Sequence, residues 1–556
     1  MKTFYSIFRH TALCQPHRCV LALTLLLLCG AFNASGAPAS GIPVRMKTPG
    51  GEEIWVRAVG DENCRHFETL DGEIVSWLPQ VRQSLAPVPQ GKRLFPYLLK
   101  QRPEVSALPS GGEAASPLRV ETESGERPAR FLVVLVDFPD RPFSVDLPYE
   151  KFNELMNGEN YTEGGTCGSA RRYFQDNSAG QFNPCFDVVG PVRMANNARY
   201  YASVGLDDSP ATKMVIEACS YLENELDFSD YDLDGDGVCD NVYFFFAGKG
   251  QADGGGTSTI WPHSATLSAF GKSLTVDNVK IENYACSPEQ NGRGQFTGIG
   301  TFCHEFCHVL GLPDLYYNGS FHPGPYSLMA SGNYNNNGYT PPALSCFERL
   351  SLGWITPEEI REDGILEIKP LHLSNSARKV TSSNPDEYYL FENRRQEGWD
   401  AYLPGHGMLA WHIEYDPQAW EDNLVNTSKR RLVDLVRADG PYSSGTALPF
   451  PGSADVTAFD FTTSPSFSTN SGASMGVSLS SIEETPEGNI TLRASVSGAS
   501  VDPIAPDTPS DHPVALYNIS GHLLLSNPSP SQLSSLPPGL YILRNADGSA
   551  SKLLIP

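Results

Sequence analysis

The segment HEFCHVLGLPD, residues 304–314, constrains the fold more than any other part of the chain. His304 and His308 are four residues apart, so on a helix their imidazoles emerge from one face and can share a metal ion. The apolar residues of the same helix fall on the opposite side, within an arc of about 100°. Gly311 suits the left-handed backbone conformation that commonly ends a helix, and Pro313 prevents the helix from resuming. The sequence therefore predicts a helix with a core face and a metal face, followed by a turn.

That turn can bring Asp314 back towards the two histidines. His304, His308 and Asp314 would then supply three ligands and leave a fourth position to water, which is typical of catalytic rather than structural zinc. Such a metal lowers the pKa of its water to near 7, and Glu305 would take the proton as general base. The predicted chemistry is hydrolysis of a peptide bond without a covalent intermediate.

Three other interpretations of this segment are open at the level of sequence. The HExxH pattern could occur by chance on a surface helix. Cys303 and Cys307 could join the histidines in a closed structural site, but on one helix these four side chains fan over about 140° and cannot converge on a tetrahedral ion. Glu348 could replace Asp314 as third ligand, although the turn at Gly311 would then lack a purpose.

Four motifs resemble the immune inhibitor A type of secreted zinc metallopeptidases, which are relatives of the metzincins. The motifs are HEFCHVLGLPD, YSLMASG from Tyr326, GSARRYFQDNSAGQF from Gly168 and PGHGMLAWHIEY from Pro404. The likeness covers roughly residues 129–496. It implies an α+β fold: a metzincin-like zinc peptidase domain with a mixed sheet and an active-site helix, followed by a mostly β region.

The same resemblance assigns roles to individual residues. It implies that His304, His308 and Asp314 bind zinc, that Glu305 is the general base, and that Met329 forms a Met-turn beneath the metal. In metzincins proper a third histidine usually stands at the position of Asp314.

Three further residues near these motifs have weaker indications. Tyr334 could help to stabilise an oxyanion, but a structural ring is the favoured interpretation. His406 and His412 lie in a strand-like segment and are predicted to be core or loop histidines.

A second metal motif is DLDGDGVCD, with carboxylates at Asp232, Asp234, Asp236 and Asp240. Alternating carboxylates with Gly237 at the sixth position match the first half of a calcium loop. Position twelve is Tyr243 instead of glutamate, so another group must complete the shell. The sequence predicts a structural calcium site here, and the alternative is a polar turn before a strand.

The N-terminus is typical of a secretory signal peptide, assigned to residues 1–39. Basic residues precede an apolar run from Val20 to Phe32, and small residues follow it. The run is shorter than the about 20 residues of a spanning helix, and no later segment is long and apolar enough to cross a membrane.

Residues 40–128 are predicted to be an inhibitory pro-segment and linker. The thiolate of Cys64 in this segment could block the zinc, although no surrounding motif supports that role.

A catalytic domain of residues 129–362 is predicted to begin at the apolar run FLVVLVDF from Phe131, which suits a strand buried on both faces. A helix is expected to open near Ser169 and a second buried strand to span Val242 to Phe246. The remaining predicted units are a β-rich region packed on the catalytic domain, a linker and a small β-rich tail, at residues 363–496, 497–513 and 514–556.

The tail resembles the C-terminal sorting domain of the type IX secretion system in Bacteroidota. That resemblance implies a secretion machinery as partner, passage through the outer membrane, and a location outside the cell or on its surface. The alternative is a small β-sandwich module that binds sugar or protein.

Composition excludes several classes of function. With 40 Lys and Arg against 64 Asp and Glu, the net charge is -24, which repels phosphate backbones and anionic lipids, so nucleic acid is not an expected partner. Hydrophobic residues make up 40% and charged residues 19%, which is unlike a disordered chain.

Eight cysteines lie beyond the pro-segment, and export would permit them to form disulfides in any of 105 pairings.

These observations predict a secreted zinc endopeptidase that cuts extracellular proteins and peptides. The alternatives are a catalytically inactive, peptidase-like surface adhesin and a zinc hydrolase acting on a non-protein amide. An adhesin would be expected to have lost Glu305 or a ligand, and none is missing.

Overall fold

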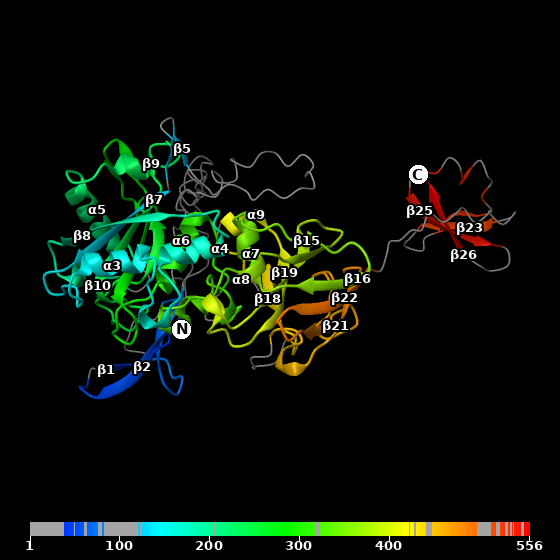
Figure 1. Cartoon of the computed structure of the whole chain (residues 1–556), viewed down its shortest axis with the longest axis horizontal. Coiled ribbons are helices and arrows are strands. Elements are labelled where there is room, and N and C mark those ends of the chain that lie inside the picture. Colours follow the sequence, from blue (N-terminus) through cyan, green and yellow to red (C-terminus); the bar gives the residue numbers. More distant parts are fainter. Residues whose placement is uncertain are drawn as a thin grey trace, which may run out of the picture. The chain divides into compact units, whose positions relative to one another are not determined.

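The computed structural model describes residues 38–496 and 513–555 with gaps. The gaps lie at residues 49, 61–63, 76–80, 83–119, 123–124, 128, 205–206, 317–322, 422, 427–429 and 441–447, and in the tail at 519–522, 527, 529–531, 534–535, 537–538 and 546–549. The chain divides into two compact units, the first ending at Ser495 and the second beginning at Val496 (Figure 1).

The first unit is built around a five-stranded sheet in the order β11-β14-β10-β7-β8. These strands are β7 (Arg130–Asp137), β8 (Cys185–Arg193), β10 (Val242–Lys249), β11 (His263–Thr266) and β14 (Asn283–Gln290). Strands β14, β10, β7 and β8 are parallel, and β11 is antiparallel to β14. Both predicted apolar runs are therefore confirmed as central strands of a mixed sheet.

Alternate residues of the central strands enter two separate cores, because successive side chains of a strand point to opposite faces. Phe131, Val133 and Leu135 pack in the core that also holds α3 (Pro148–Asn157), α4 (Ala170–Asn177) and α6 (Gly300–Leu310). Leu132, Val134 and Val136 face α5 (Ala211–Leu222). The sheet is thus covered on both faces, with α6 on the first (Figure 1).

The predicted helix near Ser169 is confirmed as α4. The Ser169 side chain caps it by accepting a hydrogen bond from the backbone N–H of Arg172 at 3.4 Å.

A second five-stranded sheet, in the order β15-β17-β18-β19-β20, follows in the chain. Leu390, Leu409, Trp411 and Ile413 from its strands belong to the same buried core as α6, so the helix is held between two sheets. The elements of this region are β15 (Glu358–Glu359), β16 (Gly364–Ile368), β17 (Arg378–Thr381), β18 (Glu387–Arg394), β19 (Gly407–Glu414), β20 (Val433–Val436), β21 (Val477–Glu484), β22 (Ile490–Val496), α7 (Cys346–Ser351), α8 (Leu371–Ser374) and α9 (Pro417–Glu421).

An antiparallel sheet formed by residues of the predicted pro-segment packs on the loops of the central sheet. Its strands are β1 (Val44–Lys47), β2 (Glu53–Gly60), β3 (Cys64–Thr69) and β4 (Val81–Arg82). Val56, Ala58 and Phe67 share a small apolar core with Ala252 and Trp261. Arg65 lies over the Trp261 ring, 4.2 Å from its centroid, and forms a buried ion pair with Asp208 at 3.2 Å.

Three small strands and a ribbon complete the first unit. They are β9 (Val238–Cys239), β12 (Leu274–Val276) and β13 (Val279–Ile281) in one sheet, and β5 (Val120–Thr122) paired with β6 (Gly125–Arg127).

The second unit is a four-stranded antiparallel sheet in the order β24-β23-β25-β26. Its strands are β23 (Pro513–Asn518), β24 (Leu523–Ser526), β25 (Gly539–Asn545) and β26 (Ala550–Ile555).

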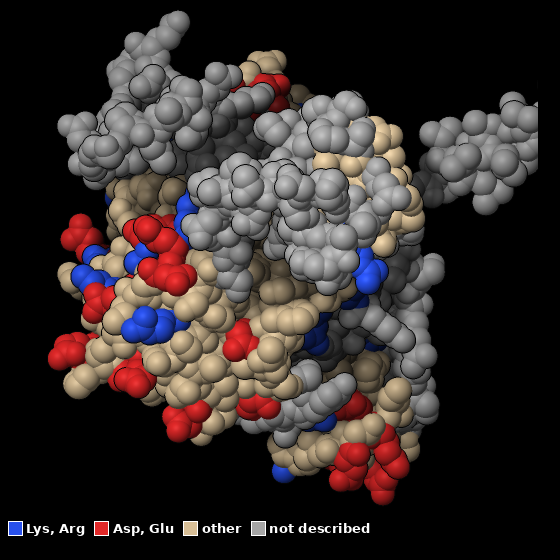
Figure 2. All heavy atoms as spheres, turned by 90° about the vertical axis from the view of Figure 1, so that its right-hand side faces the viewer, with Lys and Arg blue, Asp and Glu red and all other residues tan. Residues whose placement is uncertain are grey.

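The mixed α+β class predicted from the sequence is confirmed. The apolar run of the predicted signal peptide lies outside the described residues, as do most of the two predicted linkers. None of the described helices has both the length and the apolar character that crossing a membrane requires. On the face drawn in Figure 2, acidic and basic side chains are interspersed, and the described surface there has no continuous basic patch.

The expectation of disulfides is wrong for the cysteines that the structure describes. The eight beyond the pro-segment are free thiols, and six of them are buried. Cys303 and Cys307 sit on the core face of α6 among apolar side chains, so packing, instead of a covalent bond, accounts for their burial.

Candidate metal centre

The centre begins at the C-terminal end of α6, where the chain reverses as predicted. Gly311 adopts a φ of 102°, and its backbone N–H donates to the His308 carbonyl at 2.9 Å. The N–H of Leu312 donates to the Cys307 carbonyl, also at 2.9 Å. These two bonds form a Schellman motif, whose left-handed residue glycine adopts without a steric penalty.

This turn carries Asp314 back to the histidines of α6. The Oδ1 atom of Asp314 lies 3.2 Å from the Nε2 of His304 and 3.3 Å from the Nε2 of His308. The two imidazoles stand nearly perpendicular, with an angle of 89° between their planes. All three side chains are at least nine-tenths buried, so the structure brings together the three predicted ligands in a site shielded from bulk water.

The three converging atoms fit a tetrahedral metal ion. Donors about 2.0–2.1 Å from a tetrahedral zinc ion lie about 3.3 Å from one another, which matches both measured separations. Within the described residues, the two Nε2 atoms and Asp314 Oδ1 are buried without a hydrogen-bond partner. Three such groups are costly to leave unsatisfied, and a shared cation would satisfy all of them.

Each histidine is oriented by a backbone carbonyl. Nδ1 of His304 lies 2.8 Å from the Leu328 carbonyl, and Nδ1 of His308 lies 2.9 Å from the Leu312 carbonyl. A proton on each Nδ1 would leave the Nε2 lone pair available to a metal, as outer hydrogen bonds do in metal sites.

The predicted Met-turn lies against the centre. Met329 is fully buried, and its N–H donates to the Ser327 hydroxyl at 3.0 Å. That hydroxyl donates to Glu348 Oε1 at 2.6 Å, and Glu348 also caps α7 through Ser345. Glu348 therefore supports the turn that presents the Leu328 carbonyl. It is not among the groups that converge with the histidines, so its interpretation as third ligand is wrong.

Asn423, which the sequence interpretation missed, holds the aspartate. Its Nδ2 donates to Asp314 Oδ2 at 2.7 Å, and its Oδ1 accepts the Asp314 N–H at 2.6 Å. Trp420 Nε1 donates to the Gly311 carbonyl at 3.0 Å, and Asn426 Nδ2 donates to the Leu315 carbonyl at 2.9 Å. The turn that carries Asp314 is thus fastened by α9 and the residues after it, and no short motif in the sequence signals this contact.

In the centre, the carboxylate and the histidines each stabilise the charged form of the other. Burial lowers the pKa of His304, but the neighbouring Asp314 carboxylate outweighs this effect and raises that pKa to about 9. Burial raises the pKa of Asp314, whereas His308 and His304 lower it, and the pKa ends below its usual range. A proton is therefore retained in the metal-free cluster, and a metal must displace it.

Glu305 lies fully buried on α6 between the two histidines. Cys303 and Cys307 do not converge with the histidines, and burial raises the pKa of both thiols well above the usual value. A thiol that stays protonated is a poor metal ligand, so the closed four-ligand interpretation is wrong.

The remaining predicted residues lie elsewhere. His412 lies 2.9 Å from Glu387 Oε1 and stacks on Tyr389, and His406 pairs with Glu484 at 2.9 Å. Tyr334 donates a hydrogen bond to the Pro38 carbonyl. The side chain of Cys64 lies outside the described residues.

The second motif forms a compact loop. One carboxylate oxygen from each of Asp232, Asp234 and Asp236 lies within 4.8 Å of the others, and Gly237 has a φ of 82°. Backbone N–H groups of the loop donate to these carboxylates; for example, that of Gly237 donates to Asp232 Oδ2 at 2.8 Å. Asp240 Oδ2 instead accepts the N–H of Leu233 at 2.7 Å. The geometry is compatible with both the calcium loop and the polar turn.

A helix that presents two histidines and an intervening glutamate beside a buried carboxylate is the arrangement of a metallopeptidase. Residues 119–353 match the family described as immune inhibitor A peptidase M6, catalytic domain. The resemblance to the immune inhibitor A type of peptidases, inferred from the motifs, is thereby confirmed over this segment. The β-rich region, including Asn423, lies beyond the matched residues.

Two relatives with metalloprotease or immune inhibitor names are also similar to part of this chain. The pre-pro-metalloprotease PrtV of Vibrio cholerae serotype O1 is 28% identical, in an alignment that covers 44% of this chain and 32% of the relative. Immune inhibitor A of Bacillus thuringiensis subsp. alesti is 24% identical, covering 42% of this chain and 41% of the relative. The chain thus spans about a third to two fifths of the length of these proteins.

Proposed function

We propose that the chain is a secreted, zinc-dependent endopeptidase that hydrolyses extracellular proteins and peptides. The observation that carries the proposal is that the two histidine Nε2 atoms each lie within 3.3 Å of one Asp314 carboxylate oxygen in a buried site. The metalloprotease name of the Vibrio relative supports it. The presence of every expected ligand and of Glu305 argues against the inactive adhesin.

In this proposal His304, His308 and Asp314 hold the zinc and Glu305 is the general base. The ion, when bound, would polarise the scissile carbonyl and would supply a water that ionises near neutral pH. Glu305 accepts the proton of the attacking water and delivers it to the leaving amine. Asn423 and the Leu312 and Leu328 carbonyls keep the ligands in place, and Met329 forms the floor of the site.

Two substitutions test the proposal. Glu305→Gln should keep stoichiometric zinc but lose proteolysis by at least about a hundredfold, because it removes the base and no ligand. His304→Ala should lose both. Zinc content by mass spectrometry and cleavage of denatured casein, with and without a chelator, are the measurements, with Asp146→Asn on the exposed surface as control. Full caseinolysis by Glu305→Gln would exclude the mechanism.

The proposal includes an export and activation route. Residues 1–39 would direct secretion, and residues 40–128 would keep the enzyme inactive until they are removed. The pre-pro designation of the Vibrio relative is consistent with this order of segments. Sequencing the N-terminus of the active secreted protein would test it, because an active enzyme that retains residue 40 would contradict the inhibitory role.

A structural calcium ion at Asp232, Asp234 and Asp236 also remains a proposal. It would relieve the repulsion between three close carboxylates and stiffen the loop. Titration of the protein with Ca²⁺ in a calorimeter, compared with the variant Asp234→Asn, tests it, and absence of binding at millimolar Ca²⁺ would leave the polar turn as the explanation.

A further inference from the structure

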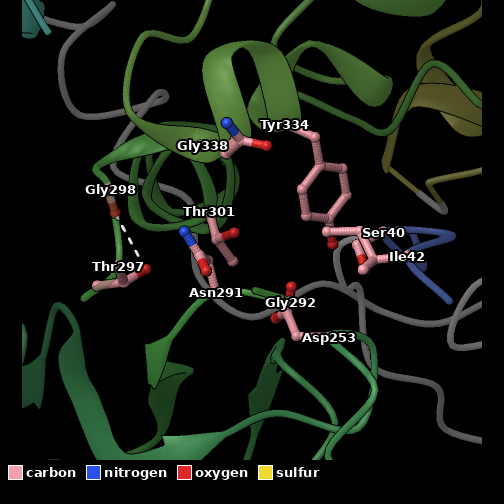
Figure 3. A pocket seen from close by; sticks show the side chains of 11 residues that line it. Ser40, Ile42, Asp253, Asn291, Gly292, Thr297, Gly298, Thr301, Tyr334 and Gly338 are labelled. Atoms are coloured by element: carbon pink, nitrogen blue, oxygen red, sulfur yellow. Dashed lines mark hydrogen bonds between the residues drawn. The ribbon is translucent and has the colours of Figure 1, made fainter. Parts of the chain in front are cut away.

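A cavity of about 150 Å³ lies beside the N-terminal half of α6. Figure 3 shows Asn291, Thr301 and Tyr334 around a common space, with Asp253 across it from Tyr334. Thr301 comes from α6, and Tyr334 comes from the 3-10 helix of residues Ser331–Gly338. The volume corresponds to roughly five waters, or to one long side chain.

Asp253 is an unusual group to line such a space. It is only 4% exposed, and no described basic side chain forms an ion pair with it. The ammonium of Lys249 donates instead to the Gly292 carbonyl at 2.7 Å. Burial raises the pKa of Asp253 to about 7, although the positive charge of Lys249 and a hydrogen bond from the Gly292 backbone partly oppose this rise. A buried carboxylate without a paired cation is costly, and such groups concentrate at functional sites.

The wall of the cavity adds a second buried polar group. Asn291 is 8% exposed, and its Oδ1 accepts the N–H groups of Arg293 and Gln295 at 3.0 and 3.1 Å. Its Nδ2 faces the Tyr339 hydroxyl, whose pKa is raised overall by burial although this contact lowers it. The cavity is therefore lined for polar recognition by one acid, one amide and the hydroxyl of Thr301.

The cavity adjoins the proposed catalytic base. Thr301 precedes Glu305 by one turn of α6, and residues at this spacing share a face of a helix. Burial, together with the carboxylates of Asp253 and Glu305, raises the pKa of Tyr334, and Tyr334 lines the cavity together with Asp253.

The start of the proposed pro-segment lines the cavity. Ser40 and Ile42 contribute to its wall, and the Ser40 hydroxyl donates to the Ala252 carbonyl at 3.0 Å. The hydrogen bond of Tyr334 goes to the carbonyl of Pro38, which lies in the predicted signal peptide. The side chains of Ser40 and Ile42 carry no charge, so neither forms an ion pair with Asp253.

We propose that this cavity is the substrate subsite that receives a lysine or arginine side chain next to the bond to be cut, with Asp253 as the specificity-determining residue. The inference rests on the proposed peptidase function and adds a substrate class to it. A cation would balance the buried carboxylate, and a guanidinium could also form a hydrogen bond with the Thr301 hydroxyl.

Paired peptides test the preference in the zinc-loaded secreted enzyme, after residues 40–128 have been removed. Sites cleaved in a peptide library identify the flanking position, and kcat/KM is then compared for peptides with arginine or its neutral analogue citrulline there. We expect a ratio on the order of tenfold or more for the wild type, falling to about one in Asp253→Asn. The exposed Asp146→Asn, which makes the same chemical change, should keep the wild-type ratio. A ratio near one in the wild type, or a ratio that Asp253→Asn leaves intact, would overturn the proposal.

A binding experiment separates the subsite from the peptidase function. Butylguanidine should bind the metal-free wild type more tightly than neutral butylurea, by calorimetry or NMR, and Asp253→Asn should abolish the difference. If the zinc-loaded secreted enzyme that lacks residues 40–128 cleaves no peptide, the peptidase proposal fails, and the butylguanidine difference still decides the subsite. Equal binding of the two probes to the wild type would exclude a cation subsite.

Discussion

At the scale of single residues, the candidate centre depends on groups that touch the ligands from outside. The two Nδ1 atoms face the Leu312 and Leu328 carbonyls, and the aspartate is paired with Asn423 through both its N–H and its Oδ2. Such outer contacts fix which atom of each ligand faces the ion. Without these contacts, the ligand side chains would lose more conformational entropy when they bind the metal.

Asn423→Ala should weaken zinc binding by about 10–100-fold, because Asp314 loses both of its hydrogen bonds to this side chain. Competition with a chromogenic zinc chelator measures the affinity. Asn384→Ala, in an exposed turn, is the matched control and should bind zinc as the wild type does. An unchanged affinity in Asn423→Ala would show that the Gly311 turn alone positions the aspartate.

At the scale of elements, the end of α6 decides where the third ligand lies. The helix stops at a left-handed glycine, and the two hydrogen bonds of the Schellman motif set the direction in which the chain leaves. The turn is then fastened from the β-rich region through Trp420 and Asn426.

Gly311→Ala should lower both stability and zinc affinity. A side chain at a φ of 102° costs about 1 kcal/mol or more, and relief of that strain would shift Asp314. Gly180→Ala provides the comparison, because Gly180 also has a positive φ, of 80°, and an added Cβ there would meet no atom within 4 Å. The temperature of thermal unfolding should fall in both variants, whereas the zinc affinity should fall only in Gly311→Ala. An equal loss of zinc affinity in both variants would indicate a global effect.

At the scale of the whole molecule, the sheet of β1 to β4, in the proposed pro-segment, packs within the first unit, whereas the tail forms a second unit. The sheet of β1 to β4 is joined to the first unit by the small core around Trp261 and by the buried pair of Arg65 and Asp208. The tail is a compact unit of its own, beginning at Val496.

Arg65→Met should loosen the pro-segment sheet, because it leaves Asp208 buried without its charge partner. Breaking a buried pair on one side costs about 3–5 kcal/mol, which hydrogen exchange of residues 53–60 would report. Arg45→Met removes an exposed pair with Glu53, 3.8 Å apart, and should cost less than about 1 kcal/mol. In Arg65→Met combined with Asp208→Leu, part of the loss should be recovered; if it is not, packing on Trp261 explains the effect.

Deletion of residues 497–556 should leave the unfolding temperature and zinc content of the first unit unchanged, because the tail forms a separate unit. If the tail is the proposed sorting domain, the same deletion should keep the protein from appearing outside the cell. A truncated protein that is exported normally would exclude that role.

Local sequence determined the ligand-bearing helix, its end and the central strands. The spacing of His304 and His308, the glycine at residue 311 and the apolar run from Phe131 each act over a few residues, where backbone sterics and side-chain periodicity decide the outcome. The three side chains of the candidate centre could therefore be predicted from the sequence. The disulfide expectation failed because whether thiols meet depends on packing between distant segments.

Only the tertiary structure decided which groups surround that helix. Asn423 lies 109 residues beyond Asp314, and Asp253 and Thr301 meet at one cavity although they belong to different elements. A lone asparagine or aspartate has no periodic pattern in sequence, since its role depends on a contact made through long-range burial. The helix and its ligands follow from local chemistry, whereas their orientation and the surrounding cavity follow from how the two sheets and the pro-segment pack against them.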